Sequence, residues 1–162
     1  ALGSDERSHL TDFVREELRR RGHDVALFGP LNGETSAWPD VACAVAENVA
    51  SGESDEGVLF CRTGTGVSMA ANKVPGIRAA LCGDAETARG ARAWNQANVL
   101  CMSLRATSEV VAGEILDAWF ANAEADASEM ENVEKLNEID RRYRAETSAE
   151  AAAAGGKKGR MV

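Results

Sequence analysis

The order of apolar and polar positions predicts strands that alternate with helices along most of the chain. Short apolar runs of the kind found in buried strands are separated by longer segments in which apolar residues recur every three or four positions. The clearest amphipathic helix is expected over 8–22, where the apolar positions are Leu10, Phe13, Val14 and Leu18. This alternation is typical of a parallel sheet that is covered by helices on both faces.

The expected elements fill one domain. Strands are expected at 1–5 (the end of a first strand), 23–29, 56–61, 77–82 and 97–104. Helices are expected at 8–22, 38–52, 84–96, 107–122 and 132–146, with a short one through 69–71. The pattern therefore predicts a single-domain, doubly wound, Rossmann-like α/β fold with a five-stranded parallel sheet and C-terminal helices. The domain is expected to cover 1–144, and 145–162 is expected to be a low-complexity tail or a helix extension.

Composition narrows the possible partners of a chain of 162 residues. The formal net charge of -8 and the pI of about 4.8 argue against nucleic-acid binding, which needs a basic face. A small anionic substrate stays possible, because a few local arginines can override the net field. No apolar run is long enough to span a membrane and no signal-peptide pattern is visible, so a cytoplasmic protein is expected.

The four cysteines do not form a metal or redox motif. None of them lies in a C-x-x-C pair, so no metal site is predicted. Cys43, Cys82 and Cys101 are expected to be buried thiols of a reducing compartment. Cys61 differs from them because it ends a strand-like run and is followed by a glycine-rich turn.

Several polar residues are expected at the edge of the sheet where ligands bind in such folds. Asp5, Cys61 and the pair 83–84 all follow predicted strands, and the carboxyl ends of parallel strands meet at one edge. The turn after Cys61, with the sequence RTGTG, fits neither a P-loop nor a G-x-S-x-G elbow. Small residues before a helix can instead aim backbone N–H groups at a developing oxyanion. Cys61 is thus a candidate base or nucleophile; the alternative is a buried cysteine beside a tight turn.

The segment 57–82, GVLFCRTGTGVSMAANKVPGIRAALC, resembles the core of the ribose-5-phosphate isomerase B family, which includes the galactose-6-phosphate isomerase subunits. The motifs GSD at 3–5, WPD at 38–40 and WNQANVL at 94–100 match other parts of that family in the same order. The resemblance runs from residue 1 to about 140. It implies a homodimer, sometimes a tetramer, whose active sites lie at the subunit interface. It also implies interconversion of aldose and ketose through a cis-enediolate, without a cofactor.

The resemblance assigns expected roles to individual residues. It implies that the thiolate of Cys61 moves the proton between C1 and C2. Asp5 matches a contact to the sugar hydroxyls, Asn95 a contact near the reacting carbonyl, and Arg105 a phosphate-binding arginine. The residues at the family's oxyanion-binding turn are Thr63, Gly64 and Gly66.

This chain departs from the family at positions that affect the substrate. Trp38 replaces a Tyr, Arg62 replaces a Gly, and Trp94 stands where the family has the His that opens the sugar ring. Trp has no basic nitrogen and cannot transfer that proton. The family's distal phosphate-binding arginines fall in 127–133, which holds Ser and Glu instead. Arg141, Arg142 and Arg144 could replace them across a dimer, or could form an exposed helix face.

These departures leave several hypotheses open. Without the ring-opening His, the substrate is expected to be acyclic. A tetrulose phosphate agrees with the missing His, whereas an unphosphorylated hydroxycarbonyl agrees with both the missing His and the missing arginines. Arg62 could bind an anion of the substrate, or it could be a solvated side chain. Trp38 and Trp94 could be packing residues or walls of a reshaped pocket. The alternatives to an isomerase are a weakly active or non-catalytic sugar-binding subunit and a biosynthetic epimerase or tautomerase.

Overall fold

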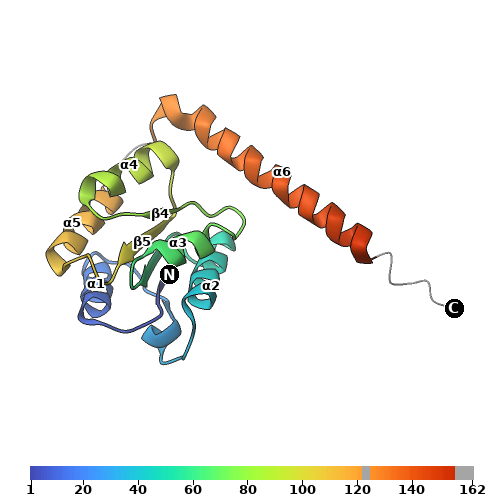
Figure 1. Ribbon diagram of the computed structural model, residues 1–162. Helices are drawn as coiled ribbons and strands as arrows, with labels where there is room; N and C mark the ends of the chain where they lie inside the picture. Colours follow the sequence, from blue (N-terminus) through green and yellow to red (C-terminus); the bar gives the residue numbers. More distant parts are fainter. Residues whose placement is uncertain (122–124, 156–162) are drawn as a thin grey trace.

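Five parallel strands form a single sheet at the centre of the molecule (Figure 1). The computed structural model describes residues 1–121 and 125–155. The strand order is β2-β1-β3-β5-β4. The strands are β1 (Leu2–Ser4), β2 (Leu27–Phe28), β3 (Gly57–Cys61), β4 (Ala79–Leu81) and β5 (Val99–Ser103). The predicted doubly wound α/β fold with a five-stranded parallel sheet is confirmed.

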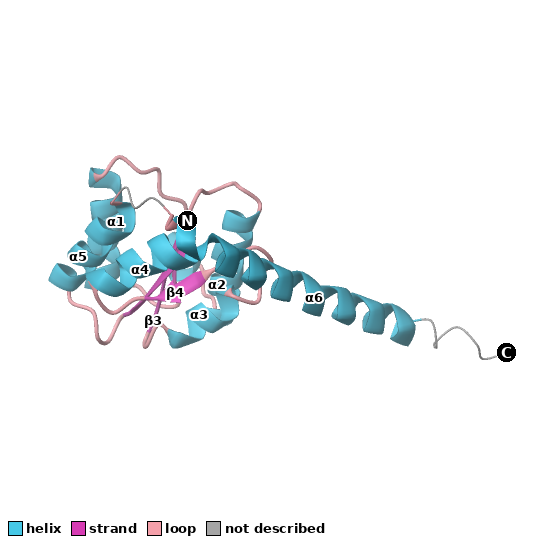
Figure 2. Ribbon diagram, turned by 90° about the horizontal axis from the view of Figure 1, so that it is seen from above, coloured by secondary structure: helices cyan, strands magenta, loops and turns pink. Residues whose placement is uncertain are grey.

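The helices cover both faces of this sheet. They are α1 (His9–Arg20), α2 (Trp38–Ala50), α3 (Thr65–Ala71), α4 (Ala85–Asn95), α5 (Glu109–Phe120) and α6 (Met130–Gly155), with 3₁₀ turns η1 (Gly29–Asn32) and η2 (Ala127–Glu129). Helices α2 and α3 pack on one face, and α1, α4 and α5 pack on the other (Figure 2). No helix in the described part of the chain is long and apolar enough to cross a membrane.

Strand β3 is buried over its whole length and separates the two halves of the core. Side chains of a strand alternate between the two faces of the sheet. Val58 and Phe60 therefore join the core under α1, α4 and α5, whereas Leu59 and Cys61 join the core under α2 and α3. The thiol of Cys61 consequently lies on the face that carries helix α3.

Two details of the prediction were wrong. The strand expected at 23–29 is reduced to Leu27–Phe28, because the end of helix α1 uses part of that segment: the N–H of His23 still donates to the carbonyl of Leu18. Cys43 is only partly buried, and its Sγ lies 3.3 Å from Oε1 of Glu47 on the surface of α2. Cys82 and Cys101 are buried as expected.

Helix α6 extends away from the body of the domain in both views (Figures 1 and 2). The helix expected at 132–146 begins at Met130 and continues to Gly155, so the predicted boundary at residue 144 falls inside it. Residues 156–162 of the expected tail and residue 122 of the expected helix at 107–122 lie outside the described residues. Large apolar side chains of α6 are exposed in the single subunit: Leu136, Ile139 and Tyr143.

Candidate active site

The carboxyl edge of the sheet gathers most of the residues that the sequence singled out. Strands β1, β3 and β5 are neighbours, and Cys61 is paired with Ser103 at their ends. Asp5 follows Ser4, the last residue of β1, which is paired with Phe60. Asp5 therefore lies beside Cys61, just beyond the end of the neighbouring strand. Polar groups from three separate stretches of sequence therefore meet around one thiol.

The loops after β3 and β5 are tied together by their backbones. The N–H of Leu104 donates to the carbonyl of Cys61 at 3.0 Å, and the N–H of Arg105 donates to the carbonyl of Arg62 at 3.1 Å. The hydroxyl of Ser103 also donates to the carbonyl of Arg62 at 3.0 Å. Ser103 was not among the predicted site residues, although a Ser at the end of a strand is a common sign of a hydrogen-bonded turn.

The turn that follows Cys61 requires glycine at position 64. Gly64 has a φ of +75°, in the left-handed region, and its N–H donates to the carbonyl of Cys61 at 3.3 Å. A Cβ at this position would lie 2.5 Å from Cδ1 of Leu81 and 3.0 Å from the carbonyl of Met102. The backbone of the turn is therefore pressed against the end of strand β5.

Helix α3 begins at this turn and no side chain caps it. Helix α2 likewise has no side-chain cap, whereas α1, α4 and α5 are capped by the side chains of Ser8, Asp84 and Ser108. The N–H groups in the first turn of a helix have no acceptor within the helix. Those of α3 are thus available to an oxygen atom of a substrate. The hydroxyls of Thr63 and Thr65 lie beside them, 2.7 Å apart, and Thr63 is exposed.

Asp5 carries a carboxylate oxygen without a partner. Its Oδ1 is buried and accepts no hydrogen bond from the described residues. Burial is the main cause that raises the pKa of this carboxyl above its usual value. A buried oxygen without a donor is costly, and a hydroxyl of a bound substrate would satisfy it.

Two arginines at this edge are also without partners. The side chains of Arg62 and Arg105 are exposed and form no ion pair or hydrogen bond within residues 1–121 and 125–143. Other arginines of the same surface are paired, as Arg7 is with Asp12 at 3.0 Å. The edge next to Cys61 therefore offers two positive groups to an anion, although the whole chain is acidic.

Trp38 covers the first turn of α3. A Cβ added at Gly66 would lie only 3.0–3.2 Å from atoms of the Trp38 ring, so the ring rests directly on the glycine. The ring is still 42 % exposed. Trp38 therefore forms one side of the space in front of the turn, and Gly66 permits this close approach.

Trp94 and Asn95 are not part of this cluster in a single subunit. They are the last residues of α4, which runs back to the amino edge of the sheet. Strand β5 rises about 13 Å from Val99 at the amino edge to Ser103 at the carboxyl edge. Trp94 is 51 % exposed and folds over Gly90 of its own helix. Trp38 and Trp94 thus lie at opposite edges of the sheet. A pocket wall formed by both rings would need two subunits.

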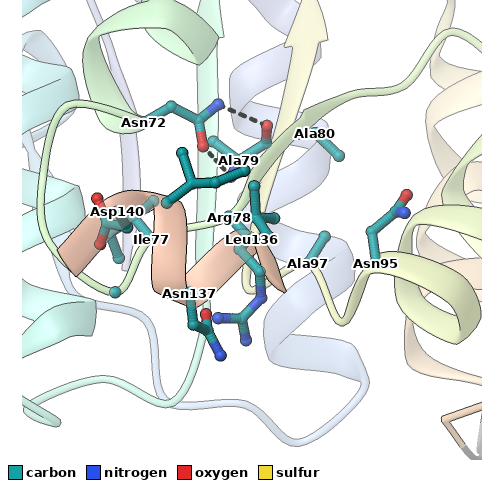
Figure 3. A pocket seen from close by; sticks show the side chains of 12 residues that line it. Asn72, Ile77, Arg78, Ala79, Ala80, Asn95, Ala97, Leu136, Asn137 and Asp140 are labelled. Carbon is teal, nitrogen blue, oxygen red and sulfur yellow. Dashed lines mark hydrogen bonds between the residues drawn. The ribbon is translucent and has the colours of Figure 1, made fainter. Parts of the chain in front are cut away.

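Asn95 instead lines a groove between edge strand β4 and helix α6 (Figure 3). The groove has a volume of about 510 Å³. Leu136 and Ile139 of α6 line it together with Ile77 and Ala79.

The segment where the family's distal arginines would fall is acidic, with Ser128 and Glu131 exposed and Glu129 partly buried. Ser128 binds its own neighbour Asp126 at 2.7 Å. Among the arginines proposed to replace them, Arg141 is paired with Glu134 at 2.6 Å, and Arg142 is exposed. The side chain of Arg144 lies outside the described part. No group of three or more metal-ligating side chains is found in the described part of the chain.

Comparison with known proteins identifies the family of the chain. A family model described as Ribose/Galactose Isomerase matches residues 1–139. Ribose-5-phosphate isomerase B of Escherichia coli K12 is 38 % identical over 146 residues, which cover 88 % of this chain and 96 % of that protein. D-erythrulose-4-phosphate isomerase of Pectobacterium atrosepticum is 36 % identical over 121 residues, or 74 % of this chain and 80 % of that protein.

A solved structure of ribose-5-phosphate isomerase B from Clostridium thermocellum superposes with a TM-score of 0.81 at 40 % identity. The match covers 88 % of this chain and 97 % of that one. The protein is thus an enzyme of the aldose–ketose isomerase class. It belongs to the ribose/galactose isomerase family, as the resemblance of its core segment predicted.

Proposed function

We propose that this protein isomerises a short, acyclic sugar phosphate of the tetrulose 4-phosphate type, with Cys61 as the base. The observation that carries the proposal is the meeting of three features at one edge of the sheet. These are the thiol of Cys61, the uncapped turn at Thr63–Gly66 and the unpaired guanidinium groups of Arg62 and Arg105.

The proposed reaction moves one proton between neighbouring carbons. The thiolate of Cys61 removes a proton from C1 of the ketose, and the C–H electron pair forms the C1–C2 double bond while the carbonyl electrons move to O2. The N–H groups of the turn bind the resulting enediolate oxygen. The thiol then returns the proton to C2, the O1 proton is released to O2, and an aldose results. No oxidant or reductant is needed, because the substrate is oxidised at one carbon and reduced at the other.

The absence of a ring-opening histidine fits a four-carbon substrate. A tetrulose 4-phosphate has its terminal hydroxyl esterified, so no hydroxyl is left that could close a five-membered ring on the carbonyl. Such a substrate needs no proton transfer to open a ring, so Trp94 at the position of the family's His does not impair the reaction. One of the relatives named above acts on D-erythrulose 4-phosphate.

Arg62 and Arg105 are proposed to hold the phosphate. Because their side chains have no acidic partner within the described residues, binding a dianion breaks no existing ion pair. Arginine guanidinium groups bind phosphate through two parallel hydrogen bonds. This pair supplies an anchor within one subunit and supports a phosphorylated rather than an unphosphorylated substrate.

The complete site is proposed to need a second copy of the chain. Asn95 lies at the amino edge of the sheet and Cys61 at the carboxyl edge, so Asn95 serves the site only if it comes from a partner subunit. The apolar side chains of Leu136 and Ile139 on α6 support a homodimer, since both are about half exposed in one subunit.

The first experiment follows deuterium entry from heavy water by proton NMR. The compounds are erythrulose 4-phosphate, ribose 5-phosphate and unphosphorylated erythrulose. We expect rapid exchange at C1 of erythrulose 4-phosphate, slower exchange on the other two, and none with Cys61→Ala. Cys43→Ala is the matched control, because that thiol lies on the surface of α2. Equal exchange by Cys61→Ala would reject the cysteine base, and no exchange on any compound would favour a non-catalytic sugar-binding subunit.

A second experiment tests the shared site by mixing inactive variants. Cys61→Ala and Asn95→Ala are refolded together, so that half of the dimers carry one copy of each. One of the two sites in each mixed dimer is then intact, and about a quarter of the wild-type activity is expected for a symmetric dimer. If mixing restores nothing, Asn95 does not act across the interface.

A further inference from the structure

The loop between α4 and β5 is held by two arginines, Arg92 in α4 and Arg78 just before β4. Nε of Arg78 donates to the carbonyl of Gln96 at 2.8 Å, and Arg92 donates to the carbonyl of Ala97 at 2.6 Å. The backbone N–H of Arg78 also donates to Oδ1 of Asn98 at 2.8 Å. Three consecutive residues of one loop are thus fixed by side-chain hydrogen bonds.

Arg92 is itself held in one orientation. Its second guanidinium nitrogen lies 2.7 Å from Oε1 of Glu56, and Oε2 of Glu56 accepts the indole N–H of Trp119 at 2.5 Å. The guanidinium carbon lies 5.1 Å from the centre of the Trp119 ring, which is buried. Arg92 therefore connects the loop to the core rather than to the solvent.

The loop needs this support because its backbone is strained. Gln96 has a φ of +48°, and no other non-glycine residue in the described part of the chain has a positive φ. For a residue with a Cβ, this left-handed conformation is unfavourable. It lets the chain turn sharply after Asn95, and Arg78 binds the carbonyl of this same residue. The two arginines also carry the positive charge that favours the carbonyl end of a helix.

We infer that Arg78 and Arg92 are positioning residues for the active site of the partner subunit. They fix the turn that ends α4 and thereby set the direction of Asn95, which lines the same groove as Arg78 (Figure 3). They lie at the amino edge of the sheet, far from Cys61 of the same chain. Their effect on catalysis therefore reaches the other subunit's thiol. The inference rests on the proposed function, in which Asn95 acts across the interface.

The test uses Arg78→Met, which keeps the apolar stem and removes the hydrogen bond to Gln96. We expect kcat to fall about 10- to 100-fold, since a small misplacement of a contacting group has effects of this size, while KM changes little. Arg89→Met is the matched control: this arginine lies on the outer face of α4, pairs with Glu86 and does not touch the loop. It should keep wild-type kcat.

Subunit mixing identifies the site on which Arg78 acts. A mixture of Arg78→Met with Cys61→Ala should recover about a quarter of the wild-type activity. A mixture of Arg78→Met with Asn95→Ala should recover none. The reverse pattern would show that Arg78 serves its own subunit's thiol, and unchanged kcat would show that the loop needs no anchor. Either result overturns the inference.

Two further measurements keep the outcome unambiguous. If Arg78→Met does not fold, as judged by circular dichroism, Arg78→Lys replaces it; the lysine keeps the charge but not the geometry, and should show the same pattern in a milder form. The control pair Cys61→Ala with Asn95→Ala is run alongside. If that pair recovers no activity on mixing, the shared site of the proposed function is rejected. If it recovers activity but Arg78→Met does not recover activity with Cys61→Ala as Asn95→Ala does, only the positioning inference is rejected.

Discussion

Replacing Gly64 by alanine tests whether the turn after Cys61 is held by contact with strand β5. The new Cβ would meet Cδ1 of Leu81 at 2.5 Å and the carbonyl group of Met102 at 3.0 Å. The leucine side chain can move, but the carbonyl group belongs to a central strand and cannot. The turn itself must therefore shift, and the N–H groups that are proposed to bind the enediolate shift with it.

The size of the effect can be separated into two parts by a matched control. Gly52 has a φ of +78°, close to the +75° of Gly64, but no atom lies within 4 Å of the Cβ that alanine would add there. Gly52→Ala should cost only the left-handed conformation, about 1–2 kcal/mol. Gly64→Ala should cost the same plus overpacking of about 1–3 kcal/mol, for a total of about 2–5 kcal/mol.

Urea denaturation gives the free energy of unfolding of both variants, and deuterium exchange on erythrulose 4-phosphate gives their activity. Gly52→Ala should keep wild-type turnover, because Gly52 lies in the turn after α2, away from Cys61. Gly64→Ala should lose at least about 100-fold, the loss typical of removing an oxyanion donor. Equal destabilisation by the two substitutions would refute the packing argument, and full activity of Gly64→Ala would refute the role of the turn.

Two other predictions concern side chains around the thiol. Burial raises the pKa of Asp5, so its negative charge destabilises the folded state once the pH rises above the ordinary Asp value of about 4. Asp5→Asn removes this charge and should raise the melting temperature at pH 7, and the gain should disappear below pH about 4. The activity of this variant should fall. Gly66→Ala should destabilise the wild-type protein by about 1 kcal/mol, because the new methyl group contacts the Trp38 ring. In the Trp38→Ala background the same substitution should be neutral or stabilising by up to about 1 kcal/mol, because helices prefer Ala to Gly. If urea denaturation gives the same cost in both backgrounds, the ring does not press on the glycine.

The sequence was sufficient for the order of the elements, because strands and helices are local patterns of period 2 and 3.6. The glycine turn after Cys61 was also visible, since a strand end, small residues and a helix start are adjacent in the chain. The same local reasoning failed for the segment 23–29, because how long an edge strand extends depends on its pairing with β1. It failed for Cys43 because the sequence alone did not show which face of α2 would pack on the sheet.

The sequence thus determined the family, the layers of the fold and the edge at which the candidate site lies. Only the tertiary structure decided that Arg62 and Arg105 are joined through their backbones while their side chains have no partner within the described residues. Only it showed that Asn95 lies at the opposite edge from Cys61, held by Arg78 and Arg92. These facts depend on contacts between residues far apart in the chain, and no periodic pattern encodes which distant groups will meet.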